Sequence, residues 1–96
     1  MAKILLKHHV LLVIAGAGRE LYGIEITQAV EAARGSSVNP NTMYARLAEL
    51  AQEGLLESRV EASDHAHGGN RRRYYKLTPA GETLANEILS KQATEA

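Results

Sequence analysis

NPNTMYARLAELAQEG, residues 39–54, is the stretch of this sequence that decides its fold. Asn39 can cap a helix with its side-chain oxygen, and Pro40 suits the first helical position, where no N–H is needed. Met43, Leu47 and Leu50 recur at helical spacing and form an apolar side. We predict a helix from Pro40 to Glu53 that stops at Gly54. Its other side carries small or polar residues, namely Asn41, Thr42, Ala45, Glu49 and Gln52.

A period-two pattern, typical of strands, follows this helix. Leu56, Ser58, Val60 and Ala62 alternate with Glu57, Arg59 and Glu61. Arg73, Tyr75 and Leu77 likewise alternate with Arg72, Tyr74 and Lys76, and Tyr75 shares a face with Leu77 and is expected in the core. Residues 63–70, which contain Gly68 and Gly69, separate the two runs, so we predict an antiparallel hairpin with a long tip.

Three further segments have the spacing of helices. The segment from Ile4 to Ala15 is apolar on nearly all sides, and the segment from Leu21 to Arg34 has one apolar stripe. Thr78 and Pro79 repeat the capping signal and start a final helix over 79–96. The predicted fold is therefore mostly α with a small β-hairpin, a winged helix-turn-helix of three helices, two strands and a last helix. Residues 1–78 would form the winged-helix domain, and 79–96 a C-terminal helix that contributes to dimerisation.

Composition limits the class of protein more than it defines a function. The 96 residues suit one small domain, and the absence of cysteine excludes disulfides and thiolate metal sites. The longest apolar run, Val10 to Ala15, is far shorter than the roughly 18 residues of a membrane span, and no signal-peptide cleavage pattern follows it. We expect a soluble cytoplasmic protein that does not contact a membrane.

The formal net charge is zero, so the distribution of charge matters more than its sum. Arg71, Arg72, Arg73 and Lys76 stand together with no acidic residue among them, and phosphate binding draws on such concentrated charge. In a winged helix-turn-helix the second helix of the pair lies in the DNA major groove, and here that helix is 40–53. Free N–H groups and the helix dipole at its start would favour a phosphate.

Side chains at the start of that helix are the predicted base readers, and the basic strand supplies phosphate or minor-groove contacts. Asn and Arg can make two-point hydrogen bonds to bases, and Thr can contact either base or backbone. The complete set of predicted DNA-contact residues is Asn39, Asn41, Thr42, Tyr44, Ala45, Arg46, Arg71, Arg72 and Tyr74.

At these residues the chain resembles the PadR family of transcriptional regulators. The resemblance rests on residues 21–26 (LYGIEI), 42–44 (TMY) with Leu47 and Leu50, 53–58 (EGLLES) and 68–81 (GGNRRRYYKLTPAG). It implies a dimeric bacterial or archaeal repressor that binds an inverted repeat in a promoter, with Tyr44 and the positions of Asn41 and Thr42 near the DNA. Asn41 stands where relatives usually carry glycine, and the final helix is short for this family. Dimerisation is therefore expected to use the N-terminal helix as well as the C-terminal one.

Simpler interpretations stay open for several of these residues. Arg71 to Arg73 could be an ordinary solvated strand edge, Tyr74 could lie on the surface, and Tyr44 could serve packing alone. The pairs His8, His9 and His65, His67 lack further ligands with metal-site spacing, so no metal and no cofactor are predicted. No arrangement of Ser, His and acidic residues suggests catalysis, so an enzyme is not expected.

Two other functions compete with DNA binding. The fold could serve only protein association, with Glu49, Glu53 and Glu57 repelling DNA. It could also be a sensor in which a small-molecule effector or a metal binds at the groove of the dimer. Double-stranded DNA and a second copy of the chain are nevertheless the partners that the sequence favours.

Overall fold

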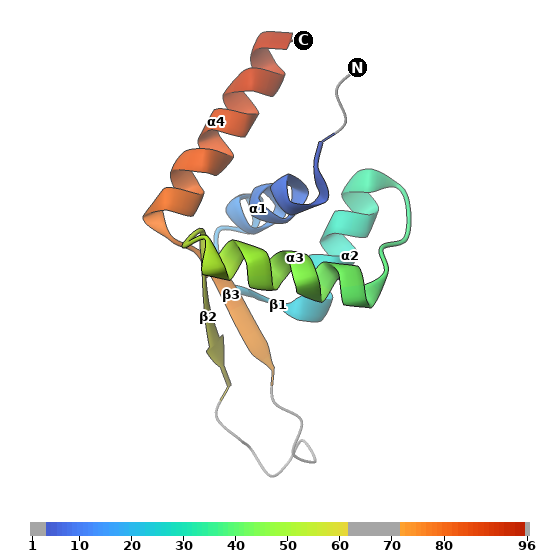
Figure 1. The fold of residues 1–96 in the computed structure, drawn as a ribbon. Helices are drawn as coiled ribbons and strands as arrows, with labels where there is room; N and C mark the ends of the chain where they lie inside the picture. Colours follow the sequence, from blue (N-terminus) through green and yellow to red (C-terminus); the bar gives the residue numbers. More distant parts are fainter. Residues whose placement is uncertain (1–3, 62–71, 96) are drawn as a thin grey trace.

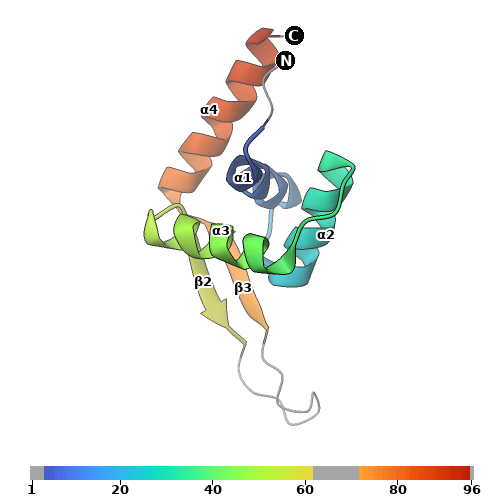
Figure 2. The same ribbon diagram turned by 45° about the vertical axis from the view of Figure 1, so that its right-hand side comes forward.

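The computed structural model describes residues 4–61 and 72–95. Their order is α1 (Leu6–Ala17), β1 (Leu21–Tyr22), α2 (Gly23–Arg34), α3 (Pro40–Gln52), β2 (Leu56–Val60), β3 (Arg73–Leu77) and α4 (Pro79–Glu95). In two views α3 crosses in front of the sheet, the hairpin of β2 and β3 extends below it, and α4 stands beside α1 (Figures 1 and 2). We call this hairpin the wing. The predicted winged helix-turn-helix is confirmed.

The core lies between the first three helices and the upper end of the sheet. Met43, Leu47 and Leu50, predicted as the apolar side of α3, are at most 1% exposed. Burial of each such side chain contributes about 1.5–3 kcal/mol, so this side of α3 is firmly held inward. The other buried residues are Val10, Leu11, Ile14, Leu21, Ile26, Val30, Leu56, Tyr75 and Ala85.

The prediction of a helix from Leu21 is wrong for its first two residues, which form β1. Leu21 pairs with Tyr75 and Tyr22 pairs with Tyr74, so the sheet has the order β1-β3-β2. The Glu25 carboxylate accepts the Tyr22 N–H at 3.1 Å, which ties the first turn of α2 back to the strand. Partners more than fifty residues away therefore fix the extended backbone at this point, and helical spacing could not reveal them.

The two faces of the wing differ in what covers them. Pairing of Ser58 with Tyr75 and of Val60 with Arg73 places these residues on the face toward α3. Ser58 and Val60 are nevertheless exposed, because the strands run past the end of the helical layer, and within β2 only Leu56 is buried. The alternating sequence pattern thus predicts correctly which face of the sheet these residues occupy, but it does not predict that Ser58 and Val60 are exposed. We call Ser58, Val60 and Arg73 the inner wing face.

The start of α4 is locked onto the turn between α3 and β2. The Thr78 hydroxyl accepts the Gly81 N–H at 3.1 Å and donates to the Gly54 carbonyl at 2.6 Å, which confirms the predicted cap. A Cβ on Gly81 would lie 2.1 Å from the Leu55 carbonyl oxygen, so this contact requires glycine. Within the described ranges, no helix has both the length and the apolarity needed to cross a membrane.

Candidate nucleic-acid interface

The first turn of α3 is capped by Asn39. Its Oδ1 accepts the N–H of Asn41 at 2.8 Å and of Thr42 at 3.4 Å, and its carbonyl accepts the N–H of Met43. Pro40 has no N–H to offer. The expectation of free N–H groups at this helix end is therefore wrong, and only the helix dipole and the side chains can attract a phosphate here.

The N-terminal side chains of α3 point outward. Asn41, Thr42 and Ala45 are exposed, and Tyr44 is 58% exposed. Because the opposite side of the helix is buried in the core, this orientation is fixed. These side chains form a continuous outward surface over the first two turns of α3.

Arg46 differs from its neighbours because its charge is already paired. Its Nη1 lies 2.5 and 2.7 Å from the two carboxylate oxygens of Glu49, one turn further along α3. The side chain is half-buried. Arg46 can reach a phosphate only by exchanging this partner, which sequence spacing could not show.

The predicted contact residues do not include Ile24, which lies beside Tyr44 at the start of α2. Ile24 is 59% exposed, and it lines a shallow hollow of about 390 Å³ together with Pro40 and Tyr44. Gly23 leaves room for the Tyr44 ring, since a Cβ there would lie 3.7 Å from Cε1. Exposed apolar groups therefore flank the polar start of α3 on its α2 side. The available signal was that Ile24 is an apolar residue that lies off the apolar stripe of α2, which runs through Ile26 and Val30.

On the face of the wing away from α3, two arginines stack on two tyrosines. The Arg72 guanidinium lies 4.8 Å from the Tyr22 ring centre, and that of Arg59 lies 4.7 Å from the Tyr74 ring centre. The two rings meet edge to face at 5.8 Å. Tyr74 is half-buried here, and Arg71 lies outside the described residues. Two predicted wing contacts, Arg72 and Tyr74, thus belong to one ordered cluster.

Carboxylates surround this cluster. Glu20 accepts hydrogen bonds from the Arg59 Nε at 3.0 and 3.1 Å, and these bonds are the main reason that the pKa of Glu20 lies below its ordinary value. Arg19 lowers the pKa of Glu25 in the same way. The pKa of Arg72 is raised, chiefly by its hydrogen bond with Tyr74. These groups are all exposed to water, so the shifts describe local pairing more than stability.

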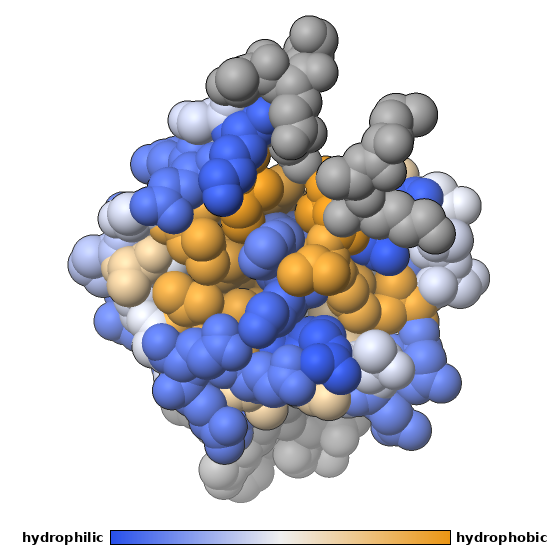
Figure 3. Space-filling model, turned by 45° about the horizontal axis from the view of Figure 1, so that its top comes forward, coloured by the Kyte–Doolittle hydropathy of each residue, from blue (hydrophilic) through white to orange (hydrophobic). Residues whose placement is uncertain are grey.

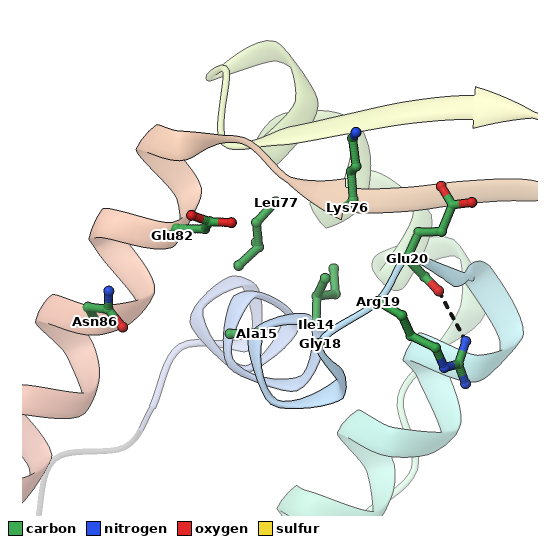
Figure 4. A pocket seen from close by; sticks show the side chains of 9 residues that line it. All are labelled: Ile14, Ala15, Gly18, Arg19, Glu20, Lys76, Leu77, Glu82 and Asn86. Carbon is green, nitrogen blue, oxygen red and sulfur yellow. Dashed lines mark hydrogen bonds between the residues drawn. The ribbon is translucent and has the colours of Figure 1, made fainter.

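A second concave site lies at the other end of the sheet, between α1 and α4. This cavity of about 420 Å³ has Ile14 and Leu77 on its apolar side and Glu82 and Asn86 on α4. Figure 4 shows the Lys76 side chain extending toward β2 and Arg19 toward α2. Glu82 and Asn86 are the polar side chains on the α4 side of the space, and Arg19, Glu20 and Lys76 line it on the other side. It could admit a small molecule with an apolar body and a hydrogen-bonding group.

The described histidines lie in α1. His9 Nδ1 lies 3.0 Å from the Arg34 Nη1, and partial burial followed by the Arg34 charge lowers the pKa of His9 below 6.5. Among the described residues, no group of three His, Asp or Glu side chains could hold a metal ion. His65 and His67 lie outside the described residues.

Comparisons with known proteins agree with this geometry. Residues 10–87 match the family described as Transcriptional regulator PadR-like family. The relative named Transcriptional regulator Rv3488, from Mycobacterium tuberculosis, is 35% identical over 88 residues, which cover 80% of this chain and 78% of the relative.

Solved structures share the same fold. A PadR-like transcription factor from Bacteroides fragilis has a TM-score of 0.77 and 28% identity, covering 93% of this chain and 81% of that one. Bacillus subtilis PadR in complex with operator DNA has a TM-score of 0.73 and 24% identity, covering 88% of this chain and 46% of that one. The family match begins within α1, spans the rest of the winged helix and ends within α4. The chain therefore belongs to the PadR-like family of transcriptional regulators.

Proposed function

We propose that this protein is a cytoplasmic repressor that binds an inverted repeat in a promoter as a homodimer and acts by occlusion. The observation that carries the proposal is the outward surface of α3, formed by Asn41, Thr42, Tyr44 and Ala45, beside a wing that bears arginines. Small and hydrogen-bonding side chains at the start of a helix suit base edges in the major groove. Because the family consists of transcriptional regulators, we propose a regulator and not an enzyme.

Each predicted contact residue has a role in this proposal. Asn41 and Thr42 read base edges, and Ala45 permits close approach or meets a thymine methyl group. Tyr44 and Arg46 reach the backbone, with Arg46 exchanging Glu49 for a phosphate, and the Asn39 amide lies close to the same strand. Arg71, Arg72 and Tyr74 contact the backbone or the minor groove from the wing. The solved complex of Bacillus subtilis PadR with operator DNA supports this arrangement by its likeness in fold.

The proposed dimer uses the apolar surface around α1 and α4. Hydrophobic residues gather on the end of the molecule where these helices lie (Figure 3). Leu5 is 58% exposed and Leu89 is 48% exposed, while Leu84 and Ile88 are only partly buried. A second copy would cover this surface, so we propose that residues 79–96 act mainly in dimerisation and residues 1–78 in DNA binding.

Selection of binding sites from random duplexes by the purified protein tests the proposal. The expected result is one inverted repeat whose half-sites lie about one duplex turn, roughly 34 Å, apart. Asn41→Ala should change which base is preferred at one position of each half-site. Arg72→Ala is the matched control, because it also shortens one side chain to alanine but lies outside α3. It should weaken binding to all duplexes and keep the preferred sequence. Selection of no common sequence would overturn the proposal.

The rival function, protein association without DNA, depends on repulsion by three glutamates. Each of them is paired with a cation in the structure. Glu49 binds Arg46, Glu53 lies 3.1 Å from the Lys7 Nζ, and Glu57 lies 3.5 Å from the Lys76 Nζ. Glu53 and Glu57 keep these partners even where Arg46 leaves Glu49 for a phosphate. The repulsion of phosphates by Glu53 and Glu57 is therefore partly neutralised, and the observation favours DNA binding.

The cavity between α1 and α4 supports a second candidate function, release of DNA by a small-molecule effector. Because the cavity borders α4, a ligand near Glu82 and Asn86 would act on the proposed dimer helix. A thermal-shift screen should then find a compound that raises the midpoint of unfolding, because a ligand of the native state stabilises it. Glu82→Ala should remove this rise while the unliganded midpoint changes little.

A further inference from the structure

The inner wing face carries the positive charge of Arg73, which belongs to the basic run predicted to bind phosphate but not to the set of predicted DNA-contact residues. Arg73 is exposed and pairs with Val60 across the wing, on the side toward α3. Its Nη1 donates to the Ser58 hydroxyl at 3.1 Å, so the guanidinium is held over the inner wing face. Arg72, the neighbouring residue, lies against Tyr22 on the opposite face.

The two faces of the wing have different charge patterns. Alternation places Glu57 and Lys76 away from α3, where they pair with each other, and Tyr74 contacts Glu61 on that same side. Glu57 is the carboxylate within β2 and β3, so the described inner wing face holds Arg73 and no acid. A polyanion approaching the wing meets less repulsion on the inner wing face than on the other side.

The inner wing face also continues the outward surface of α3. Tyr75 lies two residues from Arg73 on the same face, and burial raises its pKa. A Cβ on Gly23 would lie 3.7 Å from Tyr44 Cε1, so the Tyr44 ring lies against Gly23. Tyr22, the residue before Gly23, pairs with Tyr74, which adjoins Arg73 in β3, so Tyr44 lies on the same side of the molecule as this part of β3. A duplex that contacts Tyr44 on α3 would pass close to Arg73.

The inner wing face also has an exposed apolar residue, Val60. Val60 is 42% exposed although its sequence pattern is that of a covered position. A deoxyribose ring would cover Val60, while Arg73 and Ser58 supply hydrogen bonds to the adjoining phosphate.

Given the proposed function, on which this inference rests, we propose that the inner wing face binds the sugar–phosphate backbone beside the major groove that α3 enters. Arg73 is then the residue that binds the phosphate. Ser58 positions the guanidinium, and Val60 packs on the sugar. Arg72 then contacts backbone from the other face of the wing, so the two adjacent arginines serve different phosphates.

The test uses the duplex of highest affinity that the wild-type protein selects from a random pool. Arg73→Ala should weaken binding of the dimer by roughly a hundredfold, because about tenfold is expected for one lost hydrogen bond to a charged group and each of the two protomers loses one. The slope of log K against log salt should fall by about 1.8, which is about 0.9 for each of the two phosphate contacts, while the preferred sequence stays the same. Arg73→Lys should recover most of the slope, because it keeps the charge.

Duplexes with single methylphosphonates locate the contact. Wild-type protein should lose affinity when the phosphate beside the major groove bound by α3 is neutralised, and Arg73→Ala should be insensitive there. Arg72→Ala is the matched control and should lose its response at a different phosphate. Ser58→Ala should weaken binding slightly in the wild-type protein and not in Arg73→Ala. Circular dichroism should show both alanine variants of the arginines folded, since both residues are exposed.

Any of three results would overturn this inference while the proposed function stands. Arg73→Ala could keep the salt slope of the wild-type protein, or it could prefer different bases. Arg72→Ala and Arg73→Ala could also both become insensitive to neutralisation of the same phosphate. A wild-type protein that selects no sequence overturns the inference and the proposed function together.

Discussion

At the residue scale, Asn39 combines a structural task with a place next to the proposed DNA surface. Its Oδ1 caps two N–H groups of α3, and its side chain is exposed. The cap is worth about 1 kcal/mol, and a carboxylate can accept the same two bonds. Stability and DNA binding can therefore be separated at this position.

Asn39→Asp should leave the free energy of unfolding equal or slightly higher, because a negative charge at a helix start is favourable. Operator affinity should fall roughly thirtyfold, since a new charge several ångströms from a phosphate costs about 1 kcal/mol at the surface and each of the two protomers carries one. Denaturant unfolding and gel-shift titration measure the two effects. Asn39→Ser, the control, keeps an uncharged cap and should bind DNA nearly as tightly as the wild-type protein. If Asn39→Asp also bound as tightly as the wild-type protein, Asn39 would not lie near the phosphates.

His9 gives α1 a dependence on pH. The folded pKa is below 6.5, mainly through burial and then through Arg34, whereas the unfolded value is the ordinary one. The unfolded state therefore binds more protons below pH 6.5, and the free energy of unfolding should fall as pH drops from 6.5 through the folded pKa. Urea unfolding between pH 8 and pH 5 measures this loss, and His9→Gln should flatten the curve. Glu20 and Glu25 also lose stabilisation with falling pH, but only below 4.5.

At the element scale, two helical glycines should respond in opposite ways to alanine. Gly81→Ala in α4 places a Cβ against the Leu55 carbonyl, and because this atom is backbone, the start of α4 must move. We expect a loss of about 1–3 kcal/mol, as for overpacking. Gly16→Ala in α1 meets no atom within 4 Å and should gain about 0.5–1 kcal/mol from helix propensity. Thermal unfolding of both variants checks this, and a stable Gly81→Ala protein would mean that α4 does not rest on this turn.

Elements with local signals could be predicted from the sequence, and elements set by distant partners could not. Asn39 and Pro40 determine where α3 begins, and Thr78 does the same for α4, because caps act within a few residues. β1 is extended only because Tyr22 meets Tyr74 far along the chain. The same limit applies to the site. The alternation predicts which side of the wing Arg73 occupies, but the pairing of Arg46 with Glu49 and the stacking of Arg72 on Tyr22 are rotamer choices of the folded state.

At the scale of the whole molecule, a neutral chain can still present a charged surface to DNA. The formal charge of zero is the sum of a basic wing and acidic groups elsewhere, several of which are paired with a cation. Phosphate contacts should therefore come from few residues in each protomer. In the proposed complex, two protomers on one inverted repeat double this number, so we expect the affinity for a promoter to depend on dimerisation.

Leu89 on α4 tests this dependence. A leucine covered by a second copy contributes about 1.5–3 kcal/mol, and twofold symmetry counts it twice, so Leu89→Lys should raise the dimer dissociation constant at least about a hundredfold. Sedimentation equilibrium should give the wild-type protein twice the chain mass of 10.4 kDa and shift the variant toward that mass. Ile24→Lys changes an exposed apolar residue outside α1 and α4; it is the control and should keep the wild-type mass. Leu89→Lys should also bind a full inverted repeat about as weakly as a half-site, because only the link between the two recognition helices is lost. An unchanged mass with normal full-site binding would assign the dimer to another surface.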